Sequence, residues 1–212
     1  MPDALVELAR VDAELCKQYL AVYPLANVLR AALELQAPNS PVGLQLMADC
    51  EPDLIVSIRY RRILRDDAIG MPRHGILNLH SGILPDYRGV MATFWAMLND
   101  EPEIGATLHR IVDSGIDTGP VIGISRVQTQ PGESYLANVL GLYIDGCKML
   151  AETVAALNRG KFVQDAQPPT GPGRYYSTPD AASIERFSAK NLSLVCGDEL
   201  DLIRSASGQT RH

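Results

Sequence analysis

Two short apolar runs constrain the fold more than any other feature of the chain. Residues 52–57 read Pro-Asp-Leu-Ile-Val-Ser, and residues 75–79 read Gly-Ile-Leu-Asn-Leu. Short apolar runs of this kind are typical of strands buried on both faces, which occur mainly in parallel sheets covered by helices. They predict an α/β protein with a mostly parallel, Rossmann-like sheet flanked by helices.

Further elements follow from periodicity and capping residues. Apolar residues keep a 3–4 spacing from Leu136 to Leu157 and predict a long helix over 134–158, ended by Gly160. Ser40 and Pro41 suit the start of a helix that runs to about residue 48, and residues 92–98 resemble another helix. Residues 105–112 and 121–127 are β-like, so they pair as a hairpin or lie side by side in one sheet.

The two ends of the chain differ from this pattern. Residues 4–23 and 25–35 carry apolar side chains at helical spacing, which predicts a helical N-terminus. Residues 168–173 read Pro-Pro-Thr-Gly-Pro-Gly and interrupt regular structure. We therefore expect a core domain over 1–160 and a short C-terminal extension over 161–212.

Composition limits the partners that we expect. The net charge is −6 and the pI about 5.2, so no overall field attracts nucleic acid or an anionic membrane. The four cysteines form no CxxC pair, and charged residues interrupt the apolar positions near the N-terminus. These features predict reduced thiols, no signal peptide and a cytoplasmic protein.

The candidate site begins where the second apolar run ends. Asn78 and His80 are two positions apart, so on a strand their side chains point to the same face. An isolated Asn-x-His is more often structural, but here Leu-Pro-x-Tyr-Arg-Gly follows at 84–89. Arg88 would bind a carboxylate or fix this loop, and Tyr87 would pack. The run therefore indicates a proton-transfer site.

A second run supplies carboxylates. Asp113 and Asp117 lie in the Gly-rich turn 113–120, and a carboxylate near His80 would favour the protonated imidazole. Either aspartate could instead form an Asx turn, and local sequence does not separate the two. The spacing of His74, His80 and His109 matches no established zinc pattern, so we expect no metal. Dinucleotide, P-loop and nucleophile-elbow motifs are absent from the sequence.

The two runs together carry a resemblance to a known family. Asn78-Leu-His-x-x-x-Leu-Pro-x-Tyr-Arg-Gly89 followed by Ile116-Asp-Thr-Gly119 resembles the folate-dependent formyltransferases, over about residues 52–158. This family includes glycinamide ribonucleotide, methionyl-tRNA and amino-sugar formyltransferases, and formyltetrahydrofolate hydrolases are its relatives. The resemblance implies a catalytic triad of Asn78, His80 and Asp117, and thereby favours Asp117 over Asp113. It also implies a folate pocket that includes Arg59, Tyr60, Ile63, Leu64, Asp113 and Gly115.

The implied reaction is transfer of a formyl group from 10-formyltetrahydrofolate to a primary amine of a small molecule. The amine would belong to an amino sugar, an amino acid or a specialised metabolite. In this reaction Asn78 and protonated His80 would stabilise the oxyanion, and Asp117 would support the imidazolium. Hydrolysis of the same donor, or folate or partner binding without turnover, are the alternatives.

The sequence departs from the family at two places. Gly82 stands where the family usually has a serine, two positions after the histidine, and Ser81 precedes it. The residues before Pro52 show no opening strand, so the sheet would have an open edge. Either the N-terminal helices or a second subunit would cover that edge. In the second case the protein would be a homodimer.

Overall fold

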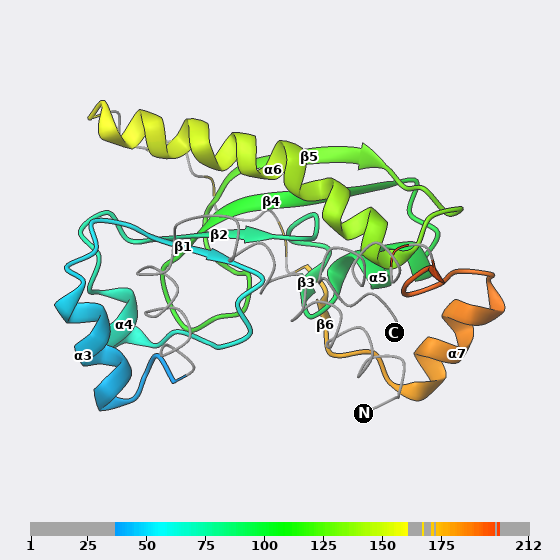
Figure 1. Cartoon of the computed structure of the whole chain (residues 1–212), viewed down its shortest axis with the longest axis horizontal. Coiled ribbons are helices and arrows are strands. Elements are labelled where there is room, and N and C mark those ends of the chain that lie inside the picture. Colours follow the sequence, from blue (N-terminus) through cyan, green and yellow to red (C-terminus); the bar gives the residue numbers. More distant parts are fainter. Residues whose placement is uncertain (1–36, 161–166, 168–170, 172, 198, 200–212) are drawn as a thin grey trace, which may run out of the picture.

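A computed structural model of the chain describes residues 37–160, 167, 171, 173–197 and 199. Figure 1 shows a twisted sheet with a long helix lying along one side of it. The elements are α3 (Pro41–Asp49), β1 (Ile55–Ile58), α4 (Asp66–Ile69), β2 (Ile76–His80), β3 (Arg88–Gly89), α5 (Ala92–Leu98), β4 (Glu103–Ile111), β5 (Val121–Gln128), α6 (Tyr135–Asn158), β6 (Tyr175–Tyr176) and α7 (Ala181–Ala189). The helices predicted at 4–23 and 25–35 lie outside the described residues.

The main sheet has the strand order β1-β2-β4-β5. β1 and β2 are parallel, whereas β2 pairs antiparallel with β4 and β4 pairs antiparallel with β5. The α/β class with helices flanking a sheet is confirmed, and the two β-like runs form a hairpin. The predicted parallel pairing holds for β1 and β2, while the hairpin makes the sheet mixed.

One face of the sheet packs against α6. Leu77 and Leu79 of β2 lie with Ala106 and Leu108 of β4 in an apolar cluster that α6 completes. Because side chains alternate across a strand, the residues between them point to the opposite face. Gly146 of α6 allows a close approach, since a Cβ there would lie 3.2 Å from the Leu79 side chain.

The opposite face is divided along its length. At one end Ile76 of β2 packs with Met47, Leu64 and Ala68 from the α3–α4 region. At the other end, β2 and β4 carry polar residues: Asn78 is paired with His109 and His80 with Thr107. At the carboxyl end of β2, the strands β2 and β4 therefore bring four polar side chains to one face of the sheet.

The capping residues begin the helices where the sequence predicts. Ser40 accepts a hydrogen bond from Gly43 N at the start of α3, and Ser134 accepts one from Ala137 N at the start of α6. α6 ends at Asn158, two residues before Gly160. No helix in the described part of the chain is long and apolar enough to cross a membrane.

The described part of the C-terminal region packs on the core. β6 pairs with β3 to form a second, two-stranded parallel sheet. α7 places Phe187 against Phe94 of α5, with ring centroids 4.4 Å apart, in a cluster that also includes Tyr135 of α6. Figure 1 shows α7 beside α5, at the end of the sheet far from α3 and α4.

Candidate active site

Three of the sequence-predicted residues meet at the carboxyl end of β2. Asp117 Oδ1 lies 3.4 Å from Asn78 Nδ2, and Asp117 Oδ2 lies 3.5 Å from His80 Nδ1. The side chains of His80 and Asp117 are 8% and 10% exposed. Asn78, His80 and Asp117 thus form one partly buried polar cluster, and the structure brings the predicted triad together.

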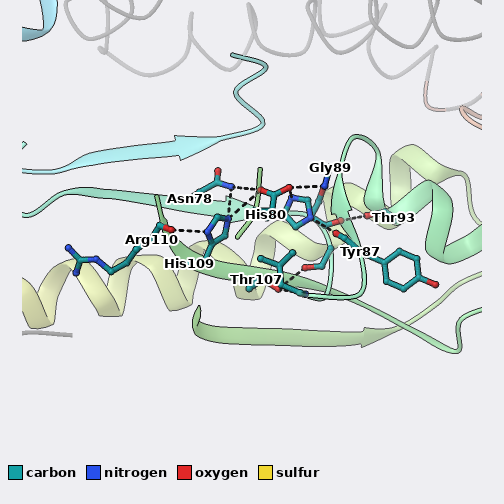
Figure 2. A network of polar contacts seen from close by, with 12 residues as sticks. Asn78, His80, Tyr87, Gly89, Thr93, Thr107, His109 and Arg110 are labelled. Carbon is teal, nitrogen blue, oxygen red and sulfur yellow. Dashed lines mark hydrogen bonds and ion pairs between the residues drawn. The ribbon is translucent and has the colours of Figure 1, made fainter. Parts of the chain in front are cut away.

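His109 is a fourth member of the cluster. Its Nε2 lies 2.9 Å from Asn78 Nδ2 and 3.4 Å from Asp117 Oδ1, while its Nδ1 lies 3.1 Å from Arg110 O (Figure 2). From the sequence, His109 was a candidate only as a metal ligand. Its signal was position: Thr107 and His109 are two residues apart on one strand, on either side of the apolar Leu108, which places both on one face.

Backbone groups of the loop after β2 complete the cluster. His80 Nε2–H donates to Tyr87 O at 2.7 Å, and Gly89 N donates to Asp117 Oδ2 at 2.8 Å (Figure 2). Both ring nitrogens of His80 therefore have a partner inside the protein. These groups could not be found from side-chain identity, because any residue carries the same carbonyl and every residue except proline the same amide.

The turns around the cluster have little space for side chains. A Cβ at Gly82 would lie 2.5 Å from Tyr87 O, and a Cβ at Gly119 would lie 1.8 Å from Arg110 O. The serine that the family usually has at the first of these positions would therefore collide with the loop in this chain. Asp117 has a φ of 53°, a left-handed conformation that Asp and Asn tolerate better than most residues.

The environment shifts the pKa of two members in the same direction. Burial lowers the pKa of His80 below its usual 6.5, against the opposing effects of the Asp117 carboxylate and the Tyr87 carbonyl. Burial alone would raise the pKa of Asp117. Hydrogen bonding by His109, the positive charge of His80 when its ring is protonated, and the Gly89 amide outweigh it and lower the pKa below 3.8. The resting site therefore favours an ionised Asp117 and a neutral His80.

The residues predicted to bind a cofactor are not members of this cluster. Arg59 and Tyr60 directly follow Ile58, the last residue of β1 paired with β2, so they lie at the same sheet edge as His80. Tyr60 and Ile63 are 38% and 52% exposed, whereas Leu64 is buried in the apolar cluster of α3 and α4. Leu64 therefore packs in the core.

The two residues predicted from the second run shape the turn. Asp113 Oδ1 accepts a hydrogen bond from Gly115 N at 2.7 Å and lies 3.5 Å from Thr118 Oγ1. Asp113 is exposed, and the cluster contains Asp117 instead. Of the two aspartates that could form an Asx turn, Asp113 is therefore the one that does.

Other candidate features of the structure lie elsewhere. A hollow of about 320 Å³ is lined by Met47, Glu51, Asp53 and Arg73, among others. It lies at the amino ends of β1 and β2, opposite the edge that carries His80. Within the described residues, no three His, Cys, Asp or Glu side chains are placed to hold a metal ion. Chemistry at the carboxyl end of β2 therefore rests on the cluster and not on this hollow.

Solved structures of other proteins share this fold. The formyltransferase PseJ from Anoxybacillus kamchatkensis, in complex with UDP-4,6-dideoxy-4-formamido-L-AltNAc and tetrahydrofolate, is 28% identical with a TM-score of 0.54. The match covers 65% of this chain and 69% of that chain. HypX from Aquifex aeolicus, in complex with tetrahydrofolic acid, has a TM-score of 0.55 at 19% identity, over 66% of this chain and 24% of that one. The second likeness concerns the fold alone.

Sequence comparison agrees with the fold. The chain is 31% identical over 132 residues to the methionyl-tRNA formyltransferase of Caldanaerobacter subterraneus subsp. tengcongensis. That match covers 61% of this chain and 41% of the relative, so the chain spans less than half of that protein. The formyl transferase profile matches residues 21–137, more than half of the 212 residues. This chain belongs to the formyl transferase family.

Proposed function

We propose that this protein transfers a formyl group from 10-formyltetrahydrofolate to a primary amine of a small molecule. The observation that carries the proposal is the Asp117 carboxylate, which lies between Asn78 and His80 at the carboxyl end of β2. In α/β sheets ligands bind at this edge, and an amide beside an imidazole–carboxylate pair can support acyl transfer. The family membership of the chain supports the same chemistry.

The residues after β1 are the proposed binding surface for a flat ring system. Tyr60 and Ile63 expose apolar surface at the sheet edge that carries His80, where a pterin ring could pack. We propose that these residues, together with Arg59, hold the folate donor, and that Asp113 and Gly115 shape the facing turn. The tetrahydrofolate complex of PseJ supports the choice of donor. The amine would attack the formyl carbon of the bound donor. As the bond between that carbon and N10 of the folate breaks, N10 would take up the proton that the amine loses, and tetrahydrofolate would leave.

His80 would act first as a proton acceptor. Its Nε2–H is held by Tyr87 O, and its lowered pKa favours the neutral ring, so Nδ1 carries a lone pair toward Asp117 Oδ2. A proton leaving the attacking nitrogen, directly or through a water, would bind at Nδ1 and be stabilised by the carboxylate. This role differs from the resting imidazolium that the resemblance implies.

Asn78 would stabilise the negative charge on the formyl oxygen, and His109 would set the orientation of its amide. His109 Nδ1–H donates to Arg110 O, so a neutral His109 accepts an N–H of Asn78 at Nε2. The second N–H of Asn78 Nδ2, which lies 3.4 Å from Asp117 Oδ1, would be the donor to the oxyanion.

The amine is proposed to belong to an amino sugar carried by a nucleotide. The sugar nucleotide in complex with PseJ supports this choice, and an amino acid or another small metabolite is the next class to test. The sequence relative that acts on methionyl-tRNA makes that substrate a necessary part of the same panel.

The test is incubation of the purified protein with 10-formyltetrahydrofolate and a panel of amines, with products identified by mass spectrometry. We expect a formylated amine to accumulate and Asn78→Ala to lower turnover about 10²–10³-fold. Asn158→Ala, at the exposed end of α6, is the matched control. Free formate without a formylated amine would indicate a hydrolase, and binding without loss of the formyl group would indicate an inactive member.

A further inference from the structure

A segment of the C-terminal region lies directly along the loop that carries two backbone groups of the cluster. Arg88 N donates to Arg174 O at 2.9 Å, and Val90 N donates to Tyr176 O at 2.9 Å. Arg174 N in turn donates to Pro85 O at 3.1 Å. Three backbone hydrogen bonds therefore hold the loop 85–90 to residues 174–176.

The loop 85–90 contributes backbone groups, and not side chains, to the cluster. Tyr87 O accepts the Nε2–H of His80, and Gly89 N donates to Asp117 Oδ2. Figure 2 shows these two contacts reaching the cluster from the loop side. Because both groups belong to the backbone, their positions depend on where the loop lies and not on which side chains it carries.

Side chains fix the same contact. The Tyr176 ring stacks on Tyr87 with a centroid distance of 5.3 Å and on Trp95 with a distance of 5.2 Å. Asn99 Nδ2 donates to the hydroxyl oxygens of both tyrosines at 3.3 and 3.2 Å, and Tyr87 O–H donates to Glu101 at 2.6 Å. The ring of Tyr176 thus lies between the loop and α5.

Two glycines let the two segments approach each other. Gly89 has a φ of 98°, and a Cβ there would lie 2.2 Å from Tyr176 O. Gly173 has a φ of 62°, and a Cβ there would lie 2.1 Å from Pro85 O. Any other residue at either position would force residues 174–176 away from the loop 85–90.

We propose that Tyr176 is a positioning residue of the active site. Its ring and its strand hold the loop 85–90 so that Tyr87 O and Gly89 N orient His80 and Asp117. The proposal rests on the proposed function for its kinetic test and on the structure alone for a second test. Tyr176 lies outside residues 21–137, the part of the chain that matches the family.

The kinetic test compares Tyr176→Ala with Tyr176→Phe in the full chain. Displacement of the loop should lower kcat about 10²-fold in Tyr176→Ala, because small shifts at an active site have effects of that size. The KM for the folate donor should stay within about twofold, since the donor residues lie after β1. Tyr176→Phe keeps the stacked ring and should restore most of kcat.

The control separates positioning from loss of stability. Phe187→Leu weakens the packing of α7 on α5 without touching the loop, so it should lower Tm and leave kcat of the folded protein unchanged. Tyr176→Leu, which keeps apolar volume without a stacking ring, serves where Tyr176→Ala does not fold. Equal kcat in wild type and in either of these two variants, Tyr176→Ala or Tyr176→Leu, would overturn the proposal.

The second test needs no substrate. The Asp117 carboxylate faces His80, His109, the Asn78 amide and the Gly89 amide, and the last of these depends on the loop. Loss of that amide should raise the pKa of Asp117 in Tyr176→Ala, as seen by carbon NMR of the carboxyl group, assigned with Asp117→Asn. An unshifted titration would overturn the proposal, even if no formyl transfer were found. A shifted titration would support the proposal. If formyl transfer were then absent, only the proposed function would be wrong.

Discussion

The two faces of the β2–β4 pair differ in what they do, although the same strands supply both. Leu77 and Leu79 pack beneath α6, while Asn78 and His80 point from the other face into a polar cluster. A shift of one residue in register would exchange the two sets. The apolar face therefore fixes the register, and the register places the polar residues opposite His109 and Thr107.

The largest effect is expected on the polar face. His80→Asn removes the proposed proton acceptor, so turnover should fall by about 10²–10⁴-fold while the midpoint of thermal unfolding changes little. Initial rates of formyl transfer check this expectation. His74→Asn, which precedes β2 outside the cluster, is the control. Full turnover in His80→Asn would mean that the polar face does not perform the chemistry.

The neighbouring residue on the apolar face should behave in the opposite way. Leu79 is 1% exposed, so Leu79→Ala should lower the free energy of unfolding by about 2–5 kcal/mol, with turnover per folded molecule largely kept. Urea unfolding measures the difference. Ile144→Ala, on the exposed side of α6 at 77% exposure, should change stability by only about 0.5 kcal/mol. A large loss of kcat in folded Leu79→Ala would show that the faces are coupled.

A smaller effect is expected in the loop after β1, where Ile63 is exposed and its neighbour Leu64 is buried. Ile63→Ala should raise the KM for the folate donor about tenfold, equivalent to about 1.4 kcal/mol, without loss of stability. Leu64→Ala should destabilise the fold and leave KM unchanged, because that side chain is buried with Met47 and Ala68. Equal KM values in Ile63→Ala and wild type would place the donor elsewhere.

The smallest effect concerns pH. An unfolded chain protonates His80 near 6.5, whereas the folded protein does so only at lower pH, because its pKa is lowered. Stability should therefore fall as the pH drops below about 6.5, and Asp117 should add a further loss only below about 3.8. Urea unfolding at about pH 7 and pH 5 tests this expectation. His80→Asn should reduce the difference, and a wild type that gains stability at pH 5 would contradict it.

The elements with strong periodicity could be predicted from the sequence. α6 begins one residue after the predicted start and ends at the predicted residue, because its apolar spacing and both ends are marked. Asn78 and His80 could be placed on one face because strands alternate. The choice of Asp117 over Asp113 needed the family resemblance, since both carboxylates occur in one turn.

Other parts of the site had a weak local signal or none. His109 joins the cluster through the register of β2 and β4, which the sequence does not display. The Tyr87 carbonyl and the Gly89 amide are common to nearly every residue, and two-residue strands such as β3 and β6 have no period to detect. Leu64 follows exposed residues in the same loop, so only packing shows that it belongs to the core.

The pairing of β3 with β6 has a consequence for the order in which the molecule is made. A ribosome adds about 5–20 residues per second, so β2, β4, β5 and α6 are all synthesised before Tyr175 and Tyr176. The sheet and its long helix can assemble from neighbouring segments while residues 85–90 still lack their partner strand. During synthesis, folding of the sheet and completion of the site are thus separate events, and the site is completed last.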